Sequence, residues 1–402
     1  MRPRWLSHGL DPRMVSMVLA LIAIWIGLHI ATDGIFLTPR NLYNLSIQTS
    51  AIAVIACGMV YVIVARQIDL SCGSLLAFTG VLTAFAQVEW FASYPAAGWI
   101  LSLFVGFAVG IAVGAFQGWW VAYRGLPALV VTLAGYLMYR GAAFLVAQGQ
   151  TIAPLNVTYQ RLGGGGAGSI GVTASWIVGA LGVAYLIYHV WHTRRELDKY
   201  GAEKGPVWLD VAKVGVGTVA ILGFVAVMVS YPDLTHTDAE GKAPGMGIGV
   251  PVLILIAVVG VLSFLARRTR FGRYVFAFGG NPEAAVLAGI NTRWLLVKIF
   301  VMMGILSTIA AVIITARLNA GANSIGLSAE LYAIAAAVIG GTSLAGGLGT
   351  VPGAVLGALF IQSLESGMVL LDVPSAQRQI IIGLVLIGAS WFDVVYTKRN
   401  PR

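Results

Sequence analysis

The sequence predicts an all-α polytopic membrane protein with about twelve transmembrane helices. Hydrophobic residues make up 58% of the 402 positions and charged residues only 10%, whereas a soluble domain carries roughly 25% charged residues. About twelve apolar runs also approach or exceed the length needed to cross roughly 30 Å of hydrocarbon. We therefore expect a single transmembrane domain over residues 1–402, embedded in a lipid bilayer.

Each predicted helix corresponds to one apolar run. In chain order the runs cover residues 14–30, 46–65, 75–88, 99–123, 127–147, 174–191, 214–231, 250–266, 299–316, 325–339, 351–364 and 380–395. The third, tenth and eleventh runs are the shortest. The first run follows three arginines, but no small-residue cleavage site comes after His29, so we expect a retained helix and not a secretory signal.

The basic residues predict which connections face the cytoplasm, because Lys and Arg in short connections are retained on that side. With the N-terminus inside, most of the 25 lysines and arginines fall on one side, including those in the loops over residues 192–213 and 267–298. Both termini are then cytoplasmic. The net charge of +9 follows from this asymmetry and from anionic lipid at that face, so it gives no reason to expect a nucleic-acid partner.

The sequence lacks the motifs of nucleotide chemistry and of metal binding. No Gly-x-x-x-x-Gly-Lys-Ser/Thr phosphate loop occurs, and the five histidines show no metal-binding spacing. Cys57 and Cys72 indicate neither a disulfide framework nor a zinc site. The single Gly-x-Gly-x-x-Gly match, at Gly163, Gly165 and Gly168, follows no buried strand and is interpreted as a linker. We therefore expect a chain that binds no cofactor or metal, is not an enzyme, and provides a path for a solute.

Ionisable residues in or near the apolar runs are candidates for that path, since a charge at membrane depth is costly and faces protein or water. The candidates are Asp69, Arg66, Arg140 and Glu330. Asp69 and Glu330 are also compatible with interfacial anchoring or helix capping, and Arg140 with a side chain that extends to the interface. Their small number argues against a proton- or sodium-coupled carrier, which needs acidic residues within its spans.

Small residues in the fourth run predict close helix packing. Gly106, Gly110, Gly114 and Gly118 recur every four residues and therefore lie on one face of that helix. Such a face lets a neighbouring backbone approach where lipid provides no hydrophobic driving force.

Two short stretches resemble one another and predict a pseudo-repeated core. Residues 69–73, with Gly80 downstream, resemble residues 343–347, with Gly353 downstream, and each lies at the cytoplasmic start of a short apolar run. A duplicated bundle places its site between the two halves, at re-entrant or broken helices. The candidate translocation path comprises Asp69, Ser71, Arg140, Glu330, Thr342 and Ser343.

Residues 271–291 interrupt the apolar chain with a basic stretch that contains several glycines and is expected to lie in water. The second part of this stretch predicts a short helix. Asn281 is its N-cap, Pro282 its first residue and Glu283 a charge near the positive end of its dipole. Gly289 is expected to end it. The helix is either an ordinary connector or a contact with another protein.

Several motifs, in order along the chain, resemble the permease subunits of bacterial monosaccharide ABC importers of the ribose and xylose type. They are Ile68-Asp69-Leu70-Ser71-x-Gly73-Ser74, Gly272-Arg273-Tyr274, Gly279-Gly280-Asn281, Glu283-Ala284-Ala285, Gly289-Ile290-Asn291 and residues 340–347. Within this family the chain most resembles the xylose type. It has the additional pair of middle spans, over residues 174–231, and the late stretch Leu371-Asp372-Val373-Pro374.

The resemblance implies a multi-pass permease of the bacterial inner membrane that moves a monosaccharide, xylose or a similar pentose. Two permease copies form the pathway in this family, separate ATPase subunits use ATP and Mg beneath it, and a periplasmic binding protein delivers the sugar. The implied ATPase-coupling segment comprises Gly272, Arg273, Gly279, Gly280, Asn281, Pro282, Glu283, Ala284, Ala285, Leu287 and Gly289. Four of these, Glu283, Ala284, Ala285 and Leu287, are expected to enter a groove of the ATPase.

The chain departs from the family pattern at a few positions, which bear on solute preference. They are Tyr332 where Asp is usual, Cys72 where Val is common, and Arg66-Gln67 where smaller or acidic residues are usual.

Two other functions remain open from the residues alone. One is a secondary sugar carrier driven by protons or sodium, with its central loop over residues 194–213. Such a carrier does not account for the capped helix after the eighth run. The other is a membrane scaffold that transports nothing, which does not account for the paired short segments.

Overall fold

The computed structural model describes residues 12–94, 96–201, 205–233 and 243–399 of the chain. Within these ranges the chain forms helices joined by short connections, and it forms no β-strand. The all-α fold class predicted from the composition is therefore confirmed.

The helices follow the order of the predicted apolar runs. In chain order the elements are α1 (Pro12–Ala31), α2 (Pro39–Val64), α3 (Cys72–Phe85), η2 (Ala86–Trp90), α4 (Gly98–Arg124), α5 (Ala128–Ala147), α6 (Val157–Gln160), η3 (Arg161–Gly163), η4 (Gly166–Gly168), α7 (Gly171–Lys199), α8 (Val207–Ser230), α9 (Val250–Arg268), α10 (Arg270–Gly280), α11 (Pro282–Leu287), α12 (Thr292–Leu318), α13 (Ala329–Ile339), α14 (Val351–Leu370) and α15 (Ser375–Arg399). The element η2 is a π-helical turn that continues α3, and η3 and η4 are short 3₁₀ turns.

Ten helices in the described part of the chain are long and apolar enough to cross a membrane, with α3 and η2 counted together. Two further apolar helices, α13 and the segment Ser375–Gly388 of α15, are shorter. With its 11 residues, α13 is about 16 Å long, roughly half the thickness of the hydrocarbon. The tenth run is therefore a broken helix. The third and eleventh runs, in contrast, extend into helices of spanning length, α3 with η2 and α14.

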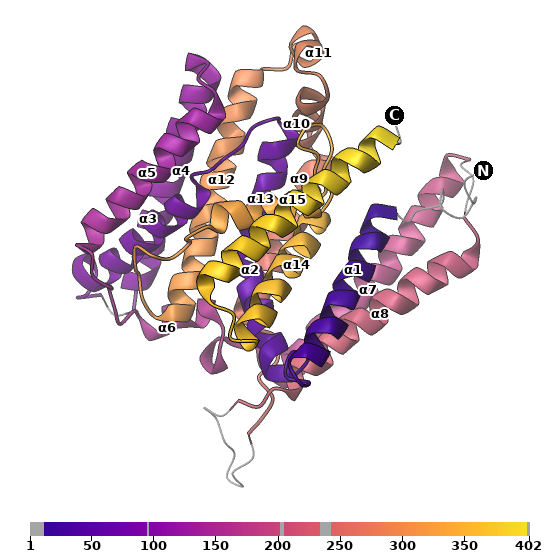
Figure 1. The fold of residues 1–402 in the computed structure, drawn as a ribbon, viewed down its shortest axis with the longest axis horizontal. Coiled ribbons are helices and arrows are strands. Elements are labelled where there is room, and N and C mark those ends of the chain that lie inside the picture. Colours follow the sequence, from indigo (N-terminus) through magenta and orange to yellow (C-terminus); the bar gives the residue numbers. More distant parts are fainter. Residues whose placement is uncertain (1–11, 95, 202–204, 234–242, 400–402) are drawn as a thin grey trace.

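Helix α2 forms the centre of the molecule, where it contacts α9, α12, α13 and α14 (Figure 1). Its apolar segment is 94% buried. A helix that faces lipid leaves one side uncovered, so this burial means that protein surrounds α2 on every side. Movements of the neighbouring helices therefore all bear on α2.

Three of the predicted glycines of α4, Gly110, Gly114 and Gly118, pack directly against α12, whereas Gly106 lies closest to Thr83 of α3. All four are buried, and a side chain at Gly110 would collide with the backbone of Gly304 on α12. A side chain at Gly114 would likewise collide with the carbonyl of Phe300. The two backbones thus lie in direct contact, and Gly304 completes the small-residue face from the partner helix.

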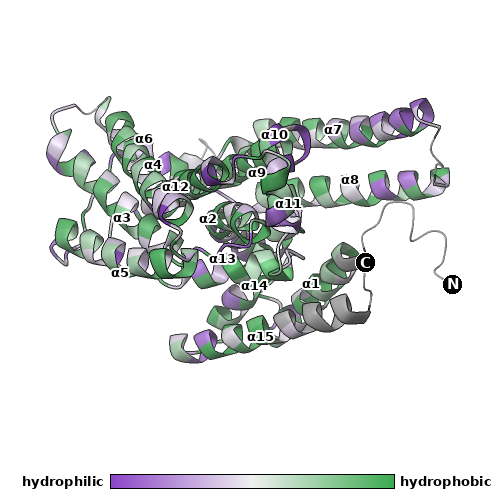
Figure 2. Ribbon diagram, turned by 90° about the horizontal axis from the view of Figure 1, so that it is seen from above, coloured by the Kyte–Doolittle hydropathy of each residue, from purple (hydrophilic) through white to green (hydrophobic). Residues whose placement is uncertain are grey.

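Helices α7 and α8 form a hairpin that projects from the rest of the bundle (Figure 2). Each has only 11% of its apolar segment buried, so most of the hairpin surface is available to lipid. The predicted loop over residues 192–213 is largely helical, because α7 continues to Lys199 and α8 begins at Val207. An ion pair of 2.7 Å between Arg194 and Asp210 joins the two helices near their polar ends.

The start of α1 and the end of α15 point toward the same end of the molecule as α10 and α11 (Figure 1). We call this end the α11 end, and the opposite end, where α6 lies, the α6 end. The predicted placement of both termini in the cytoplasm requires such an arrangement, whereas the side of the membrane that the α11 end faces stays a prediction.

Candidate functional site

The short helix predicted after residue 280 is present as α11. The Asn281 side chain accepts a hydrogen bond of 3.0 Å from the Ala284 amide, and Pro282 is the first helical residue. Ala288 is the C-cap, and Gly289 follows it with a φ of +77°, a left-handed conformation that favours glycine. Local capping chemistry thus determines both ends of this helix.

The preceding stretch, residues 271–280, for which no secondary structure was predicted, belongs to the helix α10. The Thr269 side chain caps it by accepting a hydrogen bond from the Gly272 amide at 3.3 Å. Gly272 and Gly279 are buried at close contacts: a side chain at Gly272 would meet the carbonyls of α9, and one at Gly279 the carbonyl of Val64. These glycines permit close packing of α10.

The surface of α11 that a partner can reach differs in part from the predicted one. Glu283, Ala284 and Leu287 are exposed, and Leu287 is 89% exposed. Ala285 is buried at 3% exposure, so it packs against its own chain and does not present its side chain to a partner. Val286 is 57% exposed and adds apolar surface that the motif did not indicate.

Arg66 joins the α10–α11 segment to the end of the central helix. Its guanidinium donates hydrogen bonds to the carbonyls of Gly279 at 2.7 Å and Gly280 at 2.8 Å, the last two residues of α10. Beside it, the Gly347 amide donates to the Val64 carbonyl at 2.9 Å. We call these three contacts the Arg66 link. They connect α2, α10 and the α13–α14 connection at one point.

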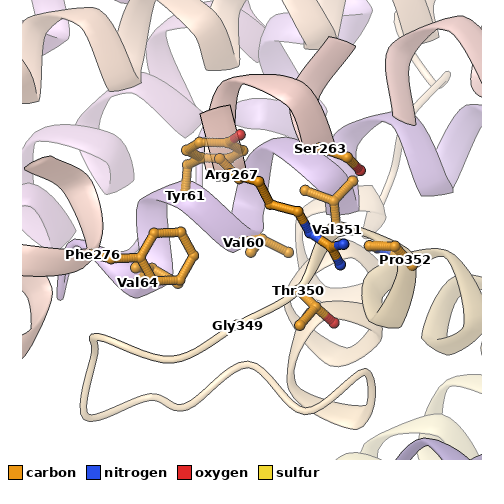
Figure 3. Close-up of a pocket in the computed structure, with 11 residues that line it drawn as sticks. Val60, Tyr61, Val64, Ser263, Arg267, Phe276, Gly349, Thr350, Val351 and Pro352 are labelled. Atoms are coloured by element: carbon orange, nitrogen blue, oxygen red, sulfur yellow. The ribbon is translucent and has the colours of Figure 1, made fainter. Parts of the chain in front are cut away.

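A cavity of about 220 Å³ lies next to the Arg66 link, between α2, α9, α10 and the start of α14 (Figure 3). Arg267 extends from α9 across this cavity toward Val351 and Pro352, and Phe276 of α10 borders it on another side. Phe276 also lines a second cavity of about 200 Å³, next to α1. Free space therefore lies beside Phe276, whereas Gly272, Val275 and Gly279 of the same helix are buried.

Four of the predicted path residues lie in the interior of the bundle. Asp69 is 1% exposed, and its Oδ1 accepts hydrogen bonds from the Ser71 amide at 2.8 Å and hydroxyl at 2.7 Å. Gln117 of α4 donates to the Ser71 hydroxyl at 2.8 Å. Asp69 therefore organises the backbone just before α3, whose N-cap is Ser71.

Arg140 and Glu330 belong to the same interior region. The Arg140 guanidinium donates to the carbonyls of Asn323, Ile325 and Gly326 at 2.5, 2.9 and 3.4 Å. It thus holds the connection between α12 and α13. Glu330 lies in the first turn of α13, is 5% exposed, and has its carboxyl against Gly73 of α3.

The other two predicted path residues, Thr342 and Ser343, lie elsewhere. They belong to the connection between α13 and α14 at the α11 end, where the Ser343 amide donates to the Leu348 carbonyl at 2.9 Å. Thr342 is fully buried there, next to Gly349. The structure thus separates the six residues into an interior group and a group beside the Arg66 link.

A cleft at the α6 end contains polar residues that the sequence analysis did not group. Its volume is about 580 Å³, and it lies between the start of α2, the end of α12, the start of α13 and the end of α14. We call it the polar cleft; its polar lining side chains are Asn41, Asn44, Gln48, Arg317, Tyr332, Gln362, Glu365 and Ser366. Of these, the motif comparison had singled out only Tyr332. The sequence shows that the polar residues of each helix lie on one face of that helix. It does not show that these faces of different helices meet at one cleft.

The comparisons with known proteins agree with this architecture. Residues 41–390 match the family described as the permease component of branched-chain amino acid transport systems. The chain belongs to this permease family. The chain is 41% identical to the xylose transport system permease protein of Haemophilus influenzae, over 95% of this chain and 96% of that protein. It is 37% identical to the Escherichia coli K12 protein of the same name, over 98% of this chain and 94% of that protein.

A more distant relative is the ribose import permease protein of Escherichia coli K12, with 29% identity over 89% of this chain and 87% of that protein. No solved structure gives a match. The resemblance drawn from the motifs is therefore confirmed at the level of the family. The permease is a multi-pass protein of the bacterial inner membrane, and its membership favours a component of a transport system over a secondary carrier.

Proposed function

We propose that the permease is the translocation subunit of an ATP-driven, binding-protein-dependent importer for a monosaccharide, xylose or a similar pentose. Two relatives that the chain matches over nearly its full length are named as xylose permeases. More distant relatives are named as permeases for arabinose and ribose. All three sugars in these names are pentoses, which supports a pentose as the solute of this permease.

In this proposal α11 is the coupling helix, and the α11 end faces the cytoplasm. The observation that carries it is an exposed, capped helix with Leu287 uncovered, attached to the central helix α2 through the Arg66 link. A helix in this position can enter a groove of another protein and pass a displacement to the centre of the bundle. The chain itself binds no cofactor; a separate cytoplasmic ATPase subunit uses ATP and Mg.

The proposed assembly contains a second copy of the permease and a periplasmic sugar-binding protein at the α6 end. The second copy completes the pathway, and the binding protein delivers the sugar next to the polar cleft. The interior residues Asp69 and Arg140 would hold the α3 and α13 segments that border this pathway.

The test is uptake of labelled xylose by proteoliposomes that contain the permease, its ATPase and its binding protein. We expect uptake only with ATP inside, and loss of at least about 90% of it in a Glu283→Lys, Ala284→Trp double variant. That loss corresponds to about 1.4 kcal/mol or more of lost coupling free energy. The variant should still insert in the membrane and unfold at the temperature of the wild type, because both positions are exposed.

The matched control is Glu196→Lys, the same charge change at an exposed position on the α7–α8 hairpin, which should leave uptake unchanged. Undiminished uptake in the double variant would refute the assignment of α11. Uptake driven by a proton gradient with the permease alone would support the secondary carrier instead.

A further inference from the structure

We propose that the polar cleft binds a neutral, polyhydroxylated solute directly, so that the permease has a sugar site of its own. This inference rests on the proposed function, which supplies the class of solute. The cleft opens at the α6 end, opposite the coupling helix, which is the end where a delivered solute would enter.

The size and position of the cleft fit this role. Its volume of about 580 Å³ falls in the range of about 300–1,000 Å³ that is usual for small-molecule sites. Three of the elements that form it, α12, α13 and α14, each contact the central helix α2, which supplies the remaining wall. A shift of any of them relative to α2 therefore changes the shape of the cleft, as a transport cycle requires.

The polar groups of the cleft match sugar hydroxyls in kind. On α2, Asn41, Asn44 and Gln48 follow a spacing of three and four residues and so share one face. On α14, Gln362 and Ser366 do the same, and they are 7% and 9% exposed. Each carboxamide offers both donors and an acceptor, and a sugar hydroxyl is likewise both donor and acceptor. Asn41 and Asn44 already donate to the carbonyls of Phe36 and Arg40, so Gln48 and Gln362 are the carboxamides that offer donors to sugar hydroxyls.

The rest of the lining is apolar and suits the carbon-bound face of a sugar ring. Ala51 and Ile52 of α2, Ile313 of α12 and Ala329 of α13 contribute to it. Polar and apolar side chains thus contribute to the lining in comparable measure, as a solute with hydroxyl groups on a carbon ring requires.

The charges of the cleft favour a neutral solute over an ion. One cation, Arg317, and one anion, Glu365, line it. The Glu365 carboxyl already lies 3.7 Å from the Arg378 guanidinium and interacts with the Tyr332 side chain. A carboxyl held in this way is less available to a ligand ammonium group, which argues against a zwitterionic amino acid as the occupant.

The experiment measures binding of ¹⁴C-labelled D-xylose to the full permease in nanodiscs, without partner proteins, with L-leucine as the competing probe. We expect saturable xylose binding that leucine does not displace. Gln362→Leu should weaken it about tenfold and Tyr332→Phe about threefold, because each removes a hydrogen-bonding group from the cleft.

A matched pair on one helix tests the location. Ser366→Ala removes a hydroxyl that lines the cleft and bonds the Asn41 side chain at 3.0 Å, and it should weaken binding about threefold. Ser363→Ala removes a hydroxyl that instead accepts a hydrogen bond from Trp25 of α1 at 2.9 Å, and it should leave binding unchanged. Thermal unfolding of each variant shows which ones fold. If Gln362→Leu does not fold, Gln362→Asn, which keeps the amide group, tests the role of Gln362 in its place.

Absence of saturable binding of xylose to the wild-type permease would overturn the proposal, as would equal xylose affinity in all cleft variants. Binding of leucine in place of xylose would identify the cleft as an amino-acid site and overturn it as well. These outcomes are separate from the test of the proposed function. ATP-driven uptake without xylose binding at the cleft refutes only the cleft, and xylose binding with proton-driven uptake refutes only the proposed function.

Discussion

Arg66 is the residue that attaches the exposed α10–α11 segment to the buried core. Its guanidinium meets the last two carbonyls of α10, where the negative end of the helix dipole stabilises a cation. Hydrogen bonds with a charged donor are also stronger than neutral ones. A displacement of α11 therefore reaches the end of α2 through this side chain.

We predict that Arg66→Ala uncouples the transporter. ATP hydrolysis by the assembled complex should stay within about twofold of the wild type, while xylose uptake falls about tenfold, equivalent to about 1.4 kcal/mol. Arg66→Lys keeps the charge but not the two-pronged geometry, so it should recover part of the uptake. The measurement is the ratio of xylose uptake to ATP hydrolysis, both determined in the same proteoliposomes.

The control is Arg124→Ala, because Arg124 lies exposed at the end of α4 and stacks on Trp119 of its own helix, 5.1 Å from the ring centre. It should change neither rate. A proportional fall of ATPase and uptake in Arg66→Ala would mean that Arg66 serves only assembly or folding.

The glycine pattern of α4 indicated a close helix contact, and this contact is formed with α12. The two backbones meet at Gly110, Gly114 and Gly304, so dispersion contacts replace the hydrophobic drive that is absent between helices in lipid. Because the contact involves backbone atoms, it has little capacity to absorb an added methyl group.

We predict that Gly114→Ala destabilises the permease by about 1–3 kcal/mol through overpacking, since the added methyl group would collide with the carbonyl of Phe300. Thermal unfolding in detergent should show a lower midpoint. Gly141→Ala on α5 is the matched control, because open space surrounds the position of its side chain, and it should leave the midpoint unchanged or raise it slightly. Equal midpoints for the two variants would contradict the packing argument.

The α10–α11 segment combines two features that suit it for transmitting movement. Cavities of about 220 and 200 Å³ both border Phe276 of α10, and hydrogen bonds hold the helix at Thr269 and at the Arg66 link. The free space permits the Phe276 side chain to shift while the contacts at the two ends are kept. The connection between α12 and α13, in contrast, is held at three carbonyls by Arg140.

The proposed orientation places the coupling helix and the polar cleft on opposite sides of the membrane. We predict that Leu287→Cys reacts with a membrane-impermeant maleimide only from the cytoplasmic side, and Glu89→Cys only from the periplasmic side. The native Cys57 and Cys72 are fully buried, so they give little background labelling. Labelling of inside-out and right-side-out vesicles measures this directly, and periplasmic reactivity of Leu287→Cys would invert the proposed topology.

The sequence alone predicted most of the helices, but it did not predict which side of each helix packs against its neighbours. Every predicted apolar run coincides with a helix, and the ends of α11 lie where Asn281 and Gly289 place them. The helical state of residues 270–280 and the burial of Ala285 were not predicted. Each of these depends on what lies next to the residue in space.

Composition and local capping therefore determined that the chain is a polytopic helical membrane protein with a short capped helix between two spans. Both follow from free energies that act within a few residues: transfer of an apolar segment into hydrocarbon and satisfaction of helix-end amides. Only the tertiary structure decided that Arg66 joins α10 to α2 and that α2, α12, α13 and α14 enclose the polar cleft. These contacts join residues hundreds of positions apart, and the packing of whole helices, which no local pattern records, brings them together.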